Sequence, residues 1–362
     1  MLLRSRKSDK LRYLDDSMQK FIQMCQATTI AAVALVFFIL SAGAEAQIPN
    51  SSPTPSPTPK PEDEEIRIET ELVNINVRVV DRNNRPISNL QKSDFKVFED
   101  GIEQKIEFFS KGEVPTKYTL LVDNSGSLRQ LIDQVIEASK IMVASNRPGD
   151  ETSIIRFISS DKIEILEDFT QNKTDLNEAL DNMYIEGGQT AIIDAVYLAV
   201  ERLNQAQPKG KDADRTRQAI VLITDGEDRA SYYKESQLLE LLKESDVQIY
   251  VIGFVNLLSA EKGFISKSPQ GKAKAFLERL ATQTGGKAYF PAGGGDLNNI
   301  ARDISGELRT QYSIGYIPTN DRQDGTFRNI KVVVPDGPKG EKRIAITKLG
   351  RIAEQPGSRL KK

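Results

Sequence analysis

A period-two pattern of apolar and polar residues begins near residue 66. Apolar residues occupy every second position from Val73 to Val79, which predicts a half-buried β-strand. Further along, the apolar runs 95–98 and 106–108 flank Asp100-Gly101, a dipeptide that favours a tight hairpin turn. Residues 66–112 are therefore expected to form a small β-module, which is short for a domain that folds alone.

Continuous apolar runs alternate with helical periodicity between residues 115 and 318. A run such as Tyr118–Val122 has no polar alternation, which is typical of a parallel strand buried on both faces. The predicted strands are residues 118–122, 154–158, 163–166, 219–223, 247–252 and 288–290. The predicted helices lie at about 128–143, 174–183, 191–206, 235–245, 272–284 and 296–310. This order predicts an α/β domain over residues 115–318, built on a doubly wound, mostly parallel sheet.

The pattern returns to β character after the last predicted helix. Gln311–Tyr316 is expected to form a last strand of the α/β sheet. Within residues 319–350, the apolar runs 330–334 and 343–346 flank Asp336-Gly337, which predicts a second hairpin. We expect this C-terminal segment to pair with residues 66–112, so that segments from both flanks build one β-module. Residues 351–362 are left as a tail.

The N-terminal 46 residues have the pattern of an export signal. A basic start is followed by the apolar run Ile30–Leu40, and Ala44-Glu45-Ala46 then places small residues two apart, as a signal peptidase requires. A cleaved signal peptide and an uncleaved anchor in the inner membrane both fit, and both place the rest of the chain outside the cytoplasm. Residues 47–65 contain a Pro-rich tract, which is typical of an extended linker.

Composition narrows the chemistry that the chain can perform. There is no histidine and a single cysteine, Cys25, so neither His-assisted hydrolase chemistry nor zinc held by His and Cys is available. The formal net charge of −2 argues against nucleic acid as a partner, because a phosphate backbone requires a basic surface. A metal ion in this chain must be a hard cation held by oxygen atoms.

Three polar clusters follow predicted strands or open a predicted helix. Asp123–Ser127 follows the first strand of the α/β domain, Thr224–Asp228 follows the 219–223 strand, and Gly187–Thr190 opens the 191–206 helix. Ligands of doubly wound sheets bind beyond the carboxyl ends of the strands, where these clusters are expected. Carboxylates and hydroxyls are the groups that a hard cation prefers.

These clusters resemble the metal-ion-dependent adhesion site of von Willebrand factor type A (vWA) domains, which have a Rossmann-like fold. The matching residues, in type and order, are Asp123, Ser125, Ser127, Thr190 and Asp225. The whole arrangement also resembles exported bacterial vWA-related proteins. The resemblance implies that the two serines ligate a cation directly, Thr190 directly or through water, and the two aspartates mainly through water. It implies magnesium, with manganese or calcium as alternatives, and a Glu or Asp of a partner protein that completes the shell.

Other interpretations of the same residues remain. Each aspartate or serine alone is also a common helix cap or turn former. At the level of function, the expectation is a metal-dependent, adhesion-type binding protein without enzymatic activity, located in the periplasm, at the cell surface or secreted. The alternatives are a structural or assembly factor of the envelope with an incidental metal, and a metal-dependent hydrolase.

Overall fold

In a computed structural model of the chain, the residues described are 72–111, 114–207, 216–258 and 268–353. The predicted signal or anchor segment and the Pro-rich linker lie outside these residues. Within the described ranges, no helix combines the length and the apolar character needed to cross a lipid bilayer.

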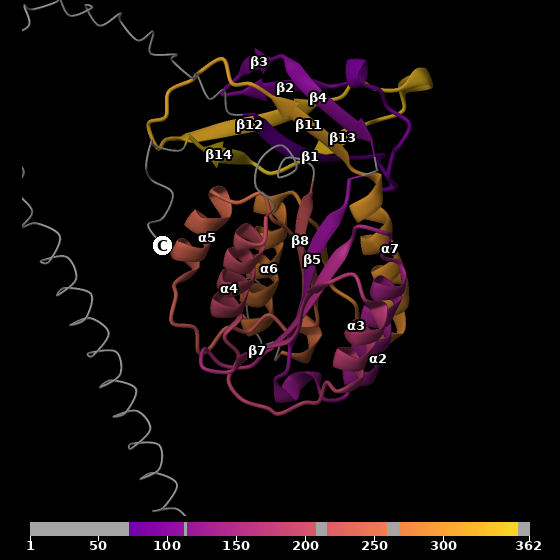
Figure 1. Cartoon of the computed structure of the whole chain (residues 1–362), viewed down its shortest axis with the longest axis vertical. Coiled ribbons are helices and arrows are strands. Elements are labelled where there is room, and N and C mark those ends of the chain that lie inside the picture. Colours follow the sequence, from indigo (N-terminus) through magenta and orange to yellow (C-terminus); the bar gives the residue numbers. More distant parts are fainter. Residues whose placement is uncertain (1–71, 112–113, 208–215, 259–267, 354–362) are drawn as a thin grey trace, which may run out of the picture. The chain divides into compact units, whose positions relative to one another are not determined.

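The α/β domain is built on a six-stranded sheet with the order β10-β9-β8-β5-β6-β7 (Figure 1). All neighbouring strands run parallel except the edge pair β6 and β7. The strands are β5 (Thr116–Asp123), β6 (Glu151–Phe157), β7 (Ile163–Thr170), β8 (Arg217–Thr224), β9 (Gln248–Gly253) and β10 (Ala288–Tyr289). Since β5 and β8 are parallel neighbours, Asp123 and Thr224 end at the same edge of the sheet.

Helices cover both faces of this sheet. Apolar residues of α4 (Ile192–Gln205), α5 (Glu235–Lys243) and α6 (Pro269–Thr284) pack on one face in a single buried cluster. Those of α2 (Ile132–Ala144), α3 (Lys173–Asp181) and α7 (Leu297–Thr310) pack on the other. Alternate residues of the central strands point to the two clusters, so Leu121 belongs to the first and Leu120 to the second. The predicted doubly wound architecture is confirmed.

The remaining strands form two four-stranded antiparallel sheets. One has the order β13-β1-β11-β4 and the other β14-β12-β2-β3, and they share one apolar core. The strands are β1 (Val73–Val80), β2 (Lys96–Glu99), β3 (Ile102–Gln104), β4 (Ile106–Lys111), β11 (Tyr312–Tyr316), β12 (Phe327–Val333), β13 (Ile344–Ile346) and β14 (Gly350–Ile352). Strands from both flanks pair with each other, which confirms the predicted β-module of mixed origin.

Three details of the predicted pairing were wrong. Residues 312–316 do not extend the α/β sheet, because β11 lies between β1 and β4 in the β-module. The segments around Asp336-Gly337 are not a hairpin, because β12 pairs with β2 while β13 pairs with β1 in the other sheet. The Asp100-Gly101 turn does join a hairpin, but its second strand is β3 rather than the 106–108 run.

A network of buried charges joins the β-module to the α/β domain. Arg78 of β1 forms an ion pair of 2.6 Å with Glu307 of α7, and their side chains are only 4% and 1% exposed. Lys287 also contacts Glu307, at 2.9 Å. Arg217, at the start of β8, donates to the carbonyls of Leu308 and Gln311. Arg78, Lys287 and Glu307 therefore have charged partners within the protein, and Arg217 has two carbonyl acceptors.

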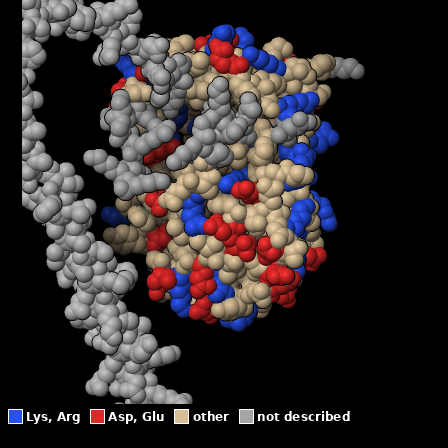
Figure 2. Space-filling view, in the orientation of Figure 1, with Lys and Arg blue, Asp and Glu red and all other residues tan. Residues whose placement is uncertain are grey.

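Charged side chains on the visible surface are mixed in sign. On the face shown in Figure 2, basic side chains gather along the right edge of the described part and acidic ones over its lower part.

Candidate metal site

The carboxylate of Asp123 is fixed at the end of β5. The residue is fully buried. One carboxylate oxygen accepts from the backbone N–H of Ser125 at 2.9 Å, and the other accepts from the Thr224 hydroxyl at 2.7 Å. The first bond is the Asx-type turn that a short acidic side chain makes with a residue two positions on. The second joins the ends of the two neighbouring strands.

Two serine hydroxyls lie directly beyond Asp123. Ser125 Oγ and Ser127 Oγ are 2.8 Å apart, at the start of the short 3-10 turn η2 (Gly126–Leu128). Ser125 is buried and Ser127 is exposed. The pair therefore connects the buried Asp123 to the protein surface, and places two neutral oxygen donors side by side.

Asp225 occupies the matching position after β8. It is buried, and its Oδ1 accepts from the backbone N–H of Glu227 at 3.0 Å. Gly226 allows this turn, because its φ is +89° and an added Cβ would lie 2.8 Å from Leu277 Cδ1 of α6. The chain can pass this close to α6 only with glycine at that position.

Thr190 is held near these loops by backbone hydrogen bonds. Its carbonyl accepts from the N–H groups of Arg229 and Ala230 in the loop after Asp225, at 2.8 and 3.1 Å. Three residues earlier, Gly187 N donates to the Asn124 carbonyl at 3.3 Å. Thr190 is buried, and its hydroxyl makes no hydrogen bond with the other four residues within the described ranges. The segment is thus tied to both aspartate loops through its main chain alone.

The electrostatics of the site favour a cation. Burial and the nearby Asp225 carboxylate raise the pKa of Asp123 to about 6. No Lys or Arg forms an ion pair with Asp123 or Asp225 in the described part of the chain, and Arg229, close to Asp225, is paired with Glu227. Buried charges are usually paired or ligate metals.

Only oxygen donors are available at this edge of the sheet. Among the described residues, no group of three or more Asp, Glu, His or Cys side chains could hold a metal without help. Two carboxylates and the serine hydroxyls make a donor set that suits a hard, hydrated cation such as magnesium. The residues present therefore fit the ion that the motif implies.

Comparison with protein families gives a match over the part of the chain that carries this site. The model of the von Willebrand factor type A domain family matches residues 119–302, about half of the chain. The chain belongs to the vWA family. This match extends from within β5 to within α7, so it includes all five predicted metal-site residues.

Individual relatives of this vWA protein are distant. Cuticlin-6 of Caenorhabditis elegans is 26% identical over 149 residues, which are 40% of this chain and 24% of that protein. Among solved structures, a von Willebrand factor type A protein from Catenulispora acidiphila is 13% identical with a TM-score of 0.44, covering 73% of this chain and 75% of its own. Proximal thread matrix protein 1 from the mussel byssus, solved with a zinc-occupied MIDAS motif, is 19% identical with a TM-score of 0.42, covering 54% and 48%.

Other residues that organise this vWA site were not identified from the sequence. Thr224 holds Asp123 through its hydroxyl. Asp228 accepts from Ile193 N at 3.1 Å and so caps α4. Asp194 is buried and accepts from the backbone N–H groups of Tyr232 and Tyr233, at 2.7 and 2.9 Å. A threonine at the end of a strand and an aspartate in the first turn of a helix are too common to have indicated these roles.

The loop that Asp194 fixes presents an aromatic side chain next to the site. Tyr232 is 84% exposed, although its backbone is anchored. Tyr233 stacks on Tyr197 of α4, with ring centroids 4.1 Å apart and planes 6° from parallel. An exposed tyrosine on a fixed backbone is a favourable contact for a protein partner, because little conformational entropy is lost on binding.

Proposed function

We propose that this vWA protein is an exported, metal-dependent binding protein without enzymatic activity, which captures an acidic residue of a partner protein. The observation that carries the proposal is the pair of buried carboxylates, Asp123 and Asp225, at one sheet edge, with no protein cation paired to them among the described residues. Ser125 and Ser127 reach from this pair to the surface. The match to the vWA family supports the same role.

Each of the five residues would have a role in holding the cation. The hydroxyls of Ser125 and Ser127 would ligate magnesium directly, Thr190 directly or through water, and Asp123 and Asp225 would supply negative charge, mainly through water. A magnesium ion held this way supplies a Lewis-acidic position for a partner's Glu or Asp. Tyr232 and the loop fixed by Asp194 would contact the partner around that position.

The second candidate is a structural or assembly factor whose metal is incidental. The observation in its favour is that both aspartates also form ordinary turns, to Ser125 N and Glu227 N, which hold the loops without an ion. These turns use one oxygen of each carboxylate, so they are compatible with either role.

Affinity capture on the immobilised full-length chain separates these candidates. Envelope extract of the producing cells is passed over wild type, Ser127→Ala and Asp175→Asn, an exposed position of α3, in magnesium and in EDTA. We expect the same partner on wild type and Asp175→Asn in magnesium, and its loss in EDTA and on Ser127→Ala. Capture that persists in EDTA would support the structural candidate. Phosphate release from an aryl phosphate by wild type, abolished in Asp225→Ala, would support an enzyme.

A further inference from the structure

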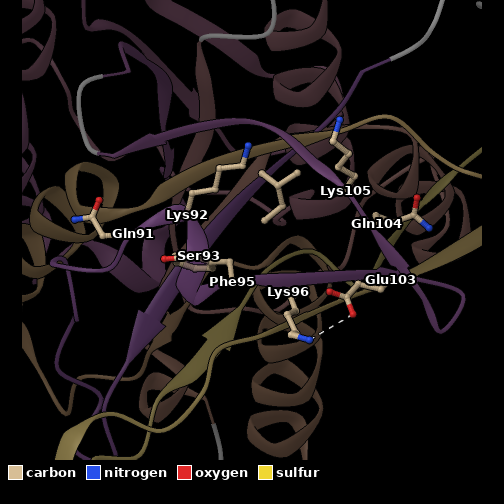
Figure 3. Close-up of a pocket in the computed structure, with 9 residues that line it drawn as sticks. Gln91, Lys92, Ser93, Phe95, Lys96, Glu103, Gln104 and Lys105 are labelled. Carbon is tan, nitrogen blue, oxygen red and sulfur yellow. Dashed lines mark hydrogen bonds and ion pairs between the residues drawn. The ribbon is translucent and has the colours of Figure 1, made fainter.

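An open groove of about 690 Å³ lies in the β-module, away from the metal site (Figure 3). It is lined by the 3-10 turn η1 (Lys92–Asp94) and by residues of β2, β3 and the start of β4. β3 and β4 are the outermost strands of their two sheets, so the groove opens at the edge where the sheets come together. It lies on the module side of β5, a strand roughly 25 Å long that ends at Asp123.

Three exposed lysines surround this groove. Lys92 comes from η1, Lys96 from β2, and Lys105 from the link between β3 and β4. Lys96 contacts Glu103 at 3.5 Å, and Lys105 contacts Glu107 at 2.8 Å. Lys92 has no carboxylate partner in the described part of the chain. Ion pairs between exposed side chains are weak, so these ammonium groups can take a new partner at little cost.

The floor of the groove is apolar and fixed. Phe95 and Ile106 line it and belong to the core shared by the two sheets, and only 5% and 8% of their surfaces are exposed, so a ligand would contact their outer edges. The Phe95 ring packs against Tyr312, with centroids 4.8 Å apart. Gln104 is held by Thr319, donating to its hydroxyl and accepting from its backbone N–H. A ligand would therefore meet a preformed surface between exposed charged side chains.

We propose that this groove is a second binding site, which takes an extended acidic peptide segment of a partner protein. Side chains of an extended segment alternate between opposite sides, so a sequence with alternating acidic and apolar residues can direct carboxylates to the lysines and apolar groups to Phe95 and Ile106. Glu103 and Glu107 interrupt the positive charge along the rim. An evenly charged polyanion is disfavoured for that reason, because some of its charges would face these carboxylates.

Fluorescence anisotropy with the full-length chain tests the proposal. The probe is a short fluorescein-labelled peptide of alternating Glu and Ile. We expect Lys92→Glu/Lys96→Glu to lower its affinity by about tenfold or more, since two attractive charges become repulsive. The matched control Lys272→Glu/Lys274→Glu, with the same charge change on exposed positions of α6, should stay within about twofold. The titrations are run in EDTA, so that the metal site cannot take the carboxylates of the peptide and the affinity measured is that of the groove.

Several outcomes would overturn the proposal. An equally tight complex with a peptide of alternating Glu and Ser would show that the apolar floor plays no part. Competition by heparin or single-stranded DNA as effective as by unlabelled peptide would identify a general basic surface. Equal losses in the two double variants would mean that net charge alone drives the association. Circular dichroism of both variants verifies that folding is retained.

Discussion

Charged side chains are buried at both ends of the parallel sheet, but among the described residues they have partners within the protein at the amino end and lack a protein cation at the carboxyl end. At the amino end, Arg78 and Glu307 neutralise each other, and Arg217 donates to two carbonyls, while burial lowers its pKa to about 10. At the carboxyl end, Asp123 and Asp225 are buried next to each other, without an ion pair in the described residues. A buried carboxylate without a protein cation must be neutralised by a proton or by a cation from outside. The protein itself therefore completes the charges of the amino end, whereas the proposed magnesium ion would complete those of the carboxyl end.

The largest change in stability is expected from removing the buried ion pair between Arg78 and Glu307 at the amino end of the sheet. Glu307→Ala leaves the buried Arg78 without its carboxylate, while Lys287 keeps its ion pair with Asp303. This variant should lower the free energy of unfolding by about 3–5 kcal/mol. Urea denaturation measures it. Asp181→Ala, which removes the partner of Lys140 on the surface, is the control and should cost less than about 1 kcal/mol. Equal costs for the two variants would refute the contrast between the ends.

The buried Asp123 carboxyl group at the carboxyl end of the sheet should make stability depend on pH. The pKa of Asp123 is raised to about 6 in the folded, metal-free protein from a usual value near 4, so the folded state binds the proton more tightly than the unfolded state. Its contribution is therefore full at low pH and is lost as the pH rises from about 4 to about 6, by at most about 3 kcal/mol. The difference in unfolding free energy between wild type and Asp123→Asn, followed in EDTA across that range, isolates this contribution. A difference that does not vary with pH would contradict it.

Magnesium should stabilise the folded protein by binding the two buried carboxylates, Asp123 and Asp225. At a free concentration of about one hundred times its Kd, the ion should raise the unfolding free energy by about 2.7 kcal/mol. Calorimetric titration should find uptake in wild type and in Asp175→Asn, an exposed position of α3, but not in Asp225→Asn. The Glu307→Ala protein should keep the stabilisation, because its defect lies at the other end. Absence of uptake in wild type would remove the basis of the metal site.

A smaller effect is expected from the loop that carries Asp225. Gly226→Ala introduces a Cβ at a φ of +89° and 2.8 Å from Leu277, which should cost about 1–2 kcal/mol and weaken magnesium uptake. Gly126→Ala is the matched control in the other aspartate loop, because its Cβ would meet no atom within 4 Å. Thermal denaturation and calorimetry of the two variants give the comparison. If both behave as wild type, the Asp225 turn does not need glycine.

The α/β domain was predictable because its signals are local. An apolar run such as Ile220–Leu222 needs no distant information to be recognised as a buried strand, and the helices between strands follow from their periodicity. The positions of Asp123, Ser125 and Asp225 at one sheet edge then follow from the parallel order of β5 and β8. Thr190 was expected on its motif alone, and the structure ties it to the other loops only by its main chain.

The β-module was less predictable because its pairings are not local. Strand β1 pairs with β11, more than two hundred residues away, and no periodicity distinguishes that partner from the α/β sheet. The segments around Asp336-Gly337 contain a good hairpin signal, yet each side is paired elsewhere. Long-range packing against the shared core overrides a local turn preference there. The roles of Asp194 and Thr224 were not predicted for the same reason, because they depend on residues distant in sequence.

The β-module and the α/β domain are joined by two short covalent connections. β4 ends at Lys111 and β5 begins at Thr116, while α7 ends at Thr310 and β11 begins at Tyr312. A mechanical load applied to the module would therefore enter the domain along two routes at once, one of them the strand that ends at Asp123. Tension would then be shared between a central strand of the sheet and a helix packed on one of its faces.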